Sequence, residues 1–365
     1  MIYLDSAATS FPKLPQVRQA VGNAMIRCAN PGRGGHPASL AGARIVYRCR
    51  ERAAKLFGCN QEQVAFTSNC THGLNIAIRS LVKPGGRVLI SGFEHNAVTR
   101  PLRALGAQVT VAGRKLFDWE DTLSRFEDGL KQGVDAAVFT HASNVFGYVL
   151  PITELSALCR RYGVPFVVDA AQSAGTEEVD MDAWGAAFVA MPGHKGLLGP
   201  MGTGLLLCGK MPEPLLYGGT GTESIRQEMP DDLPERLEAG TVNVPGIAGL
   251  EAGLAYLQQT GIGNIRRREV WEARRCVEGL TKLGLRVFSG AHQSGTVSFL
   301  APGDCEELGE ALAHRGIAVR AGLHCAPLAH ESAGTLETGT VRVSFGAGNR
   351  REDTDRFLEI LGPLL

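Results

Sequence analysis

Two short apolar runs decide the fold, and each ends in residues with reactive side chains. They read Phe166-Val167-Val168-Asp169-Ala170-Ala171-Gln172-Ser173 and Ala187-Phe188-Val189-Ala190-Met191-Pro192-Gly193-His194-Lys195. Each apolar run is uninterrupted and short, which is typical of a parallel strand buried on both faces. Ligands of open parallel sheets bind where the strands end. We therefore expect Asp169 and Lys195 to lie at the ligand-binding edge of such a sheet.

Similar runs alternate with amphipathic stretches over the first two thirds of the chain. The predicted strands are 63–67, 87–91, 108–111, 136–140, 166–169, 187–190 and 204–208, and predicted helices include 14–28, 38–57, 73–81 and 153–162. This alternation predicts an α/β protein with a mainly parallel seven-stranded sheet flanked by helices.

The pattern changes near position 247. A helical stretch over 246–283, interrupted near 260–263, precedes apolar runs at 286–288, 296–300, 318–320 and 341–344. Such a succession favours a smaller α+β domain. We predict a large domain over 15–250 and a small domain built from 1–14 and 251–365.

Composition argues against several classes of protein. The chain has 37 basic and 37 acidic residues, so it lacks the positive surface that binds nucleic acid. No apolar run reaches the ~18 residues that cross a membrane. The N-terminus has no secretory signal, and nine scattered cysteines without a Cys-x-x-Cys pair disfavour disulfides or a metal site. We expect a cytoplasmic enzyme for a small molecule, and the 46 glycines, about twice the usual ~7%, indicate close backbone approaches to a ligand.

Reactive side chains follow four of the predicted strands. The segment 68–73 opens a helix after the first strand, an arrangement that seats phosphate, and Glu94-His95-Asn96 follows the second. Asp169 and Lys195 end two later strands. Pyridoxal phosphate (PLP) needs this pair, because the lysine forms the Schiff base and the carboxylate keeps the ring nitrogen protonated. Taken singly, the acid is as readily a helix cap and the lysine a surface charge, so only the conjunction indicates a cofactor site.

Four motifs resemble the class V aminotransferase family of PLP enzymes, and within it the cysteine desulfurases. They are Leu4-Asp5-Ser6-Ala7-Ala8-Thr9, Glu94-His95-Asn96-Ala97, Val168-Asp169-Ala170-Ala171-Gln172-Ser173 and Gly193-His194-Lys195. The resemblance runs from Tyr3 to Val343 and keeps the family order. It implies the PLP-dependent transferase fold of type I and a homodimer with shared active sites.

The resemblance also implies a role for each matching residue. Lys195 would form the Schiff base, and Asp169 would hold the ring nitrogen. His95 would stack on the ring and take part in catalysis, while Gln172 and Asn144 would approach the ring oxygen. The phosphate would be bound by Cys70, Thr71 and His194, and by Thr241 of the other subunit. The alternative for His95 is a histidine with a purely structural hydrogen bond.

A desulfurase further needs a thiolate, and Cys325 lies in a suggestive setting. The segment Arg320-Ala321-Gly322-Leu323-His324-Cys325 resembles the short loop of group II desulfurases, and positive charge on Arg320 and His324 would favour the thiolate. Elsewhere a free cysteine is usually a small buried hydrophobe. Arg342 matches the family arginine that binds the substrate carboxylate, with Asn144 and Arg320 as further substrate contacts.

The implied reaction converts L-cysteine to L-alanine and leaves a persulfide on Cys325 for a sulfur-acceptor protein. Three positions depart from the family pattern: Pro192 and Cys70 replace hydroxyl residues near the phosphate, and Leu323 replaces a polar residue. Selenocysteine lyase and another class V aminotransferase or lyase activity stay open as alternatives. A non-catalytic sulfur relay or metal-binding protein is disfavoured by the intact pair of Asp169 and Lys195.

Overall fold

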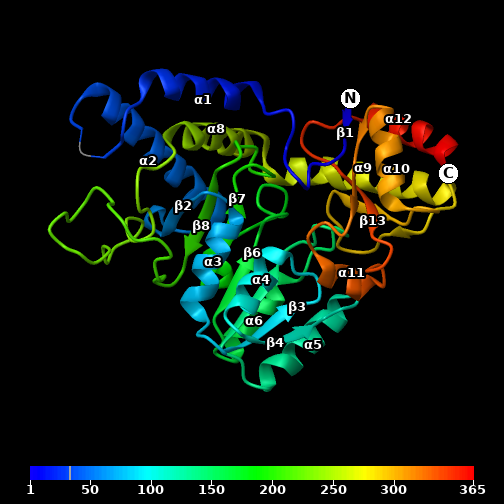
Figure 1. Ribbon diagram of the computed structural model, residues 1–365, viewed down its shortest axis with the longest axis horizontal. Coiled ribbons are helices and arrows are strands. Elements are labelled where there is room, and N and C mark those ends of the chain that lie inside the picture. Colours follow the sequence, from blue (N-terminus) through cyan, green and yellow to red (C-terminus); the bar gives the residue numbers. More distant parts are fainter. Residues whose placement is uncertain (33) are drawn as a thin grey trace.

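The computed structural model describes residues 1–32 and 34–365, and its centre is a seven-stranded sheet (Figure 1). The strand order is β2-β8-β7-β6-β5-β3-β4. The strands are β2 (Val64–Thr67), β3 (Arg87–Ser91), β4 (Gln108–Ala112), β5 (Ala136–Thr140), β6 (Phe166–Asp169), β7 (Phe188–Pro192) and β8 (Gly204–Cys208). Only the pairings of β8 are antiparallel. The prediction of a mainly parallel seven-stranded sheet is confirmed.

Helices cover both faces of this sheet, which explains the uninterrupted apolar runs. Every residue of β5 to β8 is buried, and successive side chains enter opposite cores. Val138 packs in one core with Leu74 and Val98, whereas Phe139 packs in the other with Phe57. The helices of the large unit are α1 (Pro15–Arg27), α2 (Pro37–Phe57), α3 (Cys70–Leu81), α4 (Asn96–Ala104), α5 (Trp119–Lys131), α6 (Ile152–Arg161), α7 (Met181–Trp184) and α8 (Val244–Thr260).

A four-stranded antiparallel sheet of order β12-β13-β10-β9 forms a separate unit with its own core. Its elements are α9 (Ile262–Lys282), β9 (Val287–Phe288), β10 (Thr296–Phe299), α10 (Cys305–His314), β12 (Arg320–Gly322), α11 (Pro327–Ala333), β13 (Thr340–Ser344) and α12 (Arg351–Leu361). The N-terminal strand β1 (Ile2–Tyr3) pairs with β11 (Ile317–Ala318). Both chain ends therefore meet in this unit, and the boundary at 250 stays a prediction because α8 continues past it to Thr260.

Two boundaries differ from the sequence prediction for identifiable reasons. The helix predicted from position 73 begins at Cys70, because the Asn69 side chain caps it by accepting from the His72 N–H at 2.9 Å. The strand predicted over 318–320 is two strands, because β11 pairs with β1 while β12 pairs with β13. Within residues 1–32 and 34–365, none of the helices has the length and apolar character that crossing a bilayer requires.

Candidate active site

One pocket gathers the reactive turns that follow the strands. It lies where β3, β5, β6 and β7 end. Its lining comprises Asn69, Cys70, Thr71, His95, Ala97, Thr140, Ala142, Asn144, Asp169, Ala171, Gln172, Pro192, His194 and Lys195. Every residue predicted to bind the cofactor lines this pocket except Thr241, which is exposed elsewhere on the chain.

The carboxylate of Asp169 is buried at the end of β6, with 2% of its surface exposed. Its Oδ1 accepts hydrogen bonds from the Ala171 N–H at 2.9 Å and from the Cys70 thiol at 3.4 Å. No described residue donates to Oδ2, so this oxygen is left for a protonated ligand nitrogen. The Cys70 side chain thus contacts the carboxylate, and the predicted contact of Cys70 with the phosphate stays a prediction.

Lys195 lies in the turn after β7 and is half-buried. Burial lowers the pKa of its ammonium while the charge of Asp169 opposes that shift, so the amine loses its proton more readily than a surface lysine does. The turn needs a glycine at position 193, because a Cβ there would lie 2.0 Å from Thr203 Oγ1. An amine that gives up its proton readily and lies on a tight turn is suited to attack an aldehyde.

The N-terminal segment fixes this turn from the other side. The His194 carbonyl oxygen accepts from the Ser10 N–H at 2.9 Å and from Lys13 Nζ at 2.8 Å. Burial lowers the pKa of Lys13 to about 8. Sequence reasoning missed Lys13, since nothing about a single lysine among prolines distinguishes it from a surface charge.

The start of α3 supplies the anion-binding end of the pocket. The cap by Asn69 leaves the N–H groups of Cys70 and Thr71 without partners inside the helix, and such groups attract phosphate. The hydroxyl of Thr71 and the ring of His194 line the same pocket. No group of three or more His, Cys, Asp or Glu side chains in the described ranges is placed to hold a metal ion.

His95 combines its two predicted alternatives. Its Nδ1 accepts from the Ala97 N–H at 3.0 Å and so caps α4. Burial lowers the pKa of the ring, so the histidine is neutral and its proton is on Nε2. The ring also lines the pocket, where it can stack on a planar ligand.

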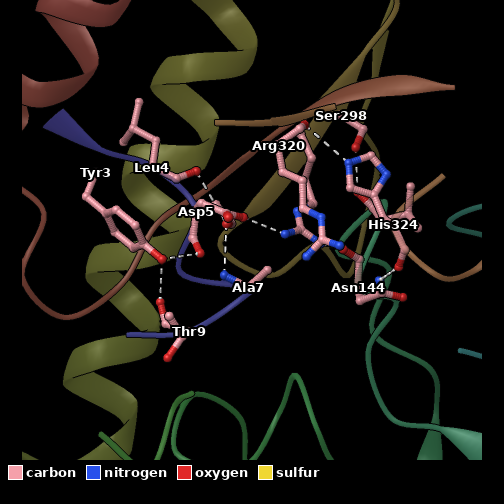
Figure 2. Close-up of polar contacts among 12 residues, drawn as sticks. Tyr3, Leu4, Asp5, Ala7, Thr9, Asn144, Ser298, Arg320 and His324 are labelled. Carbon is pink, nitrogen blue, oxygen red and sulfur yellow. Dashed lines mark hydrogen bonds and ion pairs between the residues drawn. The ribbon is translucent and has the colours of Figure 1, made fainter. Parts of the chain in front are cut away.

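The Cys325 loop is bonded to two walls of the pocket. The Cys325 carbonyl accepts from the Asn96 N–H at 2.8 Å, and the His324 carbonyl accepts from Asn144 Nδ2 at 2.8 Å. Figure 2 shows the Asn144 side chain beneath His324. The Cys325 side chain is exposed. An accessible thiol therefore lies on backbone that contacts the lysine–aspartate pocket.

Comparison with known proteins agrees with this geometry. The family model for aminotransferase class-V matches residues 2–357. The chain belongs to this family. A protein from Methanothermobacter thermautotrophicus, described as a probable cysteine desulfurase, is 32% identical over 100% of this chain and 94% of its own length. A cysteine desulfurase from Haloferax volcanii is 31% identical over 99% of this chain and 88% of its own.

Solved structures of the class V family superpose closely. The apo cysteine desulfurase from Thermococcus onnurineus gives a TM-score of 0.93 at 32% identity and covers 100% of this chain and 94% of its own. A cysteine desulfurase from Escherichia coli in an S-sulfonic acid form gives 0.84 at 26% identity, over 99% and 94% of the two chains. The predicted fold type is confirmed.

The prediction that positive charge on both Arg320 and His324 favours the Cys325 thiolate is wrong for His324. Burial lowers the pKa of His324 to about 2, because its side chain faces the interior and leaves 4% of the residue exposed. His324 is neutral and adds no positive potential at Cys325. Arg320 keeps that possibility, since it is exposed and its charge acts on both His95 and Lys195.

Arg342 lies on β13 and is almost fully enclosed, with 2% exposed. Its Nη2 donates to Asp5 Oδ1 at 2.6 Å and its Nη1 donates to the Asn144 carbonyl at 2.9 Å. Its Nε has no partner among the described residues. Asp5 is thus part of the site (Figure 2), although the sequence predicts no role for it beyond its place in a family motif.

Proposed function

We propose that this chain is a PLP-dependent cysteine desulfurase, which converts L-cysteine to L-alanine and holds the sulfur as a persulfide on Cys325. The observation that carries the proposal is the meeting of two features at one pocket. A half-buried lysine lies in that pocket with a buried carboxylate, and an exposed thiol lies on a loop hydrogen-bonded to its walls through Asn96 and Asn144.

The residues present suit PLP. The start of α3 with Thr71 and His194 would hold the phosphate, Asp169 Oδ2 would pair with the ring nitrogen, and Lys195 would bond to the aldehyde. Bound PLP supplies an electron sink that lowers the cost of removing a proton from the substrate α-carbon. Members of the family use this cofactor, which supports the assignment.

The steps of the reaction would then be carried out by different side chains of this protein. Arg342 and Asn144 bind the substrate carboxylate, as a fixed guanidinium does well, and Lys195 takes the α-proton. The Cys325 thiolate attacks the substrate sulfur, so that an S–S bond forms while the C–S bond breaks. The electron pair left on the β-carbon accepts a proton, Lys195 returns a proton to the α-carbon, and L-alanine is the co-product.

A homodimer would complete the site, with Thr241 reaching the phosphate of the neighbouring subunit. The helices α1 and α2 expose large apolar side chains, Met25, Ile26, Leu40 and Tyr47, and such patches are typical of interfaces. All nine cysteines are free thiols, in keeping with a reducing cytoplasm. An acceptor protein would collect the sulfur at the exposed Cys325.

The experiment is sulfide and alanine release from L-cysteine by the purified, PLP-loaded protein. Cys325→Ala is expected to abolish sulfide release and to retain the visible absorption of bound PLP, whereas Lys195→Ala is expected to lose that absorption. Cys28→Ala, at another partly exposed thiol, is the matched control and should behave as wild type. Full-rate sulfide release by Cys325→Ala would refute the proposal, and rates on L-selenocysteine decide the alternative substrate.

A further inference from the structure

A buried chain of hydrogen bonds lies behind the proposed nucleophile and includes a histidine that the mechanism does not use. His330 Nδ1 lies 2.8 Å from Thr335 Oγ1, and its Nε2 lies 3.4 Å from His324 Nδ1. His324 Nε2 lies 3.2 Å from the Arg320 carbonyl oxygen. The two ring planes lie at 8° to each other, and their centroids are 5.6 Å apart, as expected when one ring nitrogen donates to the other. His324, His330 and Thr335 expose 4%, 0% and 1% of their surfaces.

The carbonyl at one end fixes every proton in this chain. A carbonyl oxygen only accepts, so His324 Nε2 carries the hydrogen. Burial lowers the pKa of His324 to about 2 and that of His330 to about 4, so both rings are neutral. His324 Nδ1 must then accept from His330 Nε2–H, and His330 Nδ1 must accept from the Thr335 hydroxyl.

This order of donors and acceptors excludes a role for His324 as a base. Both of its ring nitrogens are occupied, and the chain ends on a carbonyl oxygen that does not accept a proton from it at ordinary pH. A proton from the Cys325 thiol therefore has no route through these rings. What the chain does is hold the His324 ring in one orientation.

The backbone at His324 and Cys325 needs such support. Their φ angles are +53° and +56°, and residues other than glycine adopt this left-handed region only at a cost in free energy. Asn144 and Asn96 hold the two carbonyls on the pocket side. The buried ring holds the same turn from behind.

We propose that His330, oriented by Thr335, is a positioning residue for sulfur transfer. It fixes the ring of His324 and so maintains the left-handed turn that presents the Cys325 thiol to the pocket. The inference rests on the proposed function only for what the thiol does, since the anchoring is a property of the free chain. His330 acts through His324 and touches neither substrate nor cofactor.

The test compares His330→Leu, which removes the donor to His324, with His330→Gln, whose amide Nε2 can replace it. His314→Leu, at an exposed histidine on α10, is the matched control. The readouts are kcat and KM for L-cysteine on the PLP-loaded enzyme, and amide hydrogen exchange of the peptide spanning 322–328 without substrate. His330→Leu is expected to lower kcat by about 10- to 100-fold with KM within about threefold, since small misplacements of a reacting group have effects of that size.

Hydrogen exchange is expected to rise about tenfold in the 322–328 peptide of His330→Leu, because the anchored turn opens more often. His330→Gln should restore both readouts to within about threefold of wild type. Equal impairment of the two variants, or unchanged kcat and exchange in His330→Leu, would overturn the inference. So would an exchange increase spread evenly over β13 and α10, because His330 would then be an ordinary core residue.

Thr335→Val covers the case in which His330→Leu does not fold. This substitution removes only the hydroxyl at the far end of the hydrogen-bond chain. It should lower kcat and raise hydrogen exchange in the same way as His330→Leu, but by smaller factors. A Thr335→Val protein equal to wild type in both readouts contradicts the inference. If wild type releases no sulfide, the proposed function fails. The exchange comparison still decides the anchoring.

Discussion

The ion pair of Arg342 with Asp5 offers a direct test of how the site is held together. The two side chains are 2% and 19% exposed, and their atoms lie 2.6 Å apart. Asp5→Asn keeps the shape and a hydrogen-bond acceptor but removes the negative charge. A buried guanidinium then loses its counter-ion, and leaving a buried charge unpaired is strongly destabilising.

The size of the effect follows from the geometry. Unit charges about 4 Å apart attract with about 4 kcal/mol at the effective dielectric constant of ~20 that suits protein sites. The retained amide hydrogen bond and the partial exposure of Asp5 reduce this value. We expect Asp5→Asn to lower the free energy of unfolding by about 3 kcal/mol, near the lower end of the range for broken buried pairs.

Urea denaturation followed by circular dichroism measures this loss. The matched control is Asp355→Asn, because Asp355 pairs with Arg275 and Arg351 at the surface and is 51% exposed. Surface pairs contribute about 0–1 kcal/mol, so the control should unfold close to wild type. The reasoning is refuted if Asp5→Asn costs less than about 1 kcal/mol, or if the two variants lose equal stability.

Three further predictions concern the large unit. Burial raises the pKa of Glu94 to about 8. The stability that its protonated form contributes is therefore complete below its ordinary pKa of 4.5 and is lost as the pH rises through about 8. Glu94→Gln should flatten the pH dependence of the free energy of unfolding over that window, as measured by urea denaturation, and an unchanged pH profile contradicts this. Cys70→Ala removes a donor to the β6 carboxylate and should weaken PLP binding about fivefold in a titration of the apoenzyme, whereas Cys70→Ser should bind normally. Gly193→Ala places a Cβ 2.0 Å from Thr203 Oγ1 and should cost about 2–3 kcal/mol by urea denaturation, against no loss for Gly22→Ala, where no atom lies within 4 Å.

The sequence predicts the central sheet well because burial on both faces leaves a strong signal. The apolar runs of β5 and β6 match their predicted bounds, and the residues after them enter one pocket because parallel strands share a carboxyl edge. Local pattern carries this information, so no knowledge of distant contacts is needed.

Features that depend on distant partners were not predictable in the same way. The thiol of Cys70 turns to Asp169, 99 positions along the chain. The neutrality of His324 follows from its burial, which its neighbours in the sequence do not reveal. The pairing of Asp5 with Arg342 spans 337 positions. Side-chain direction and burial are tertiary properties, and composition near a residue does not fix them.

The small unit draws its strands from both ends of the chain, and this arrangement sets the order in which the protein is completed during synthesis. Asp5 is made 337 residues before its partner Arg342. A nascent chain that stops after β8 has all the residues of the lysine–aspartate pocket, but neither the guanidinium nor the Cys325 loop. The residues that line the lysine–aspartate pocket are therefore all made before the Cys325 loop and Arg342.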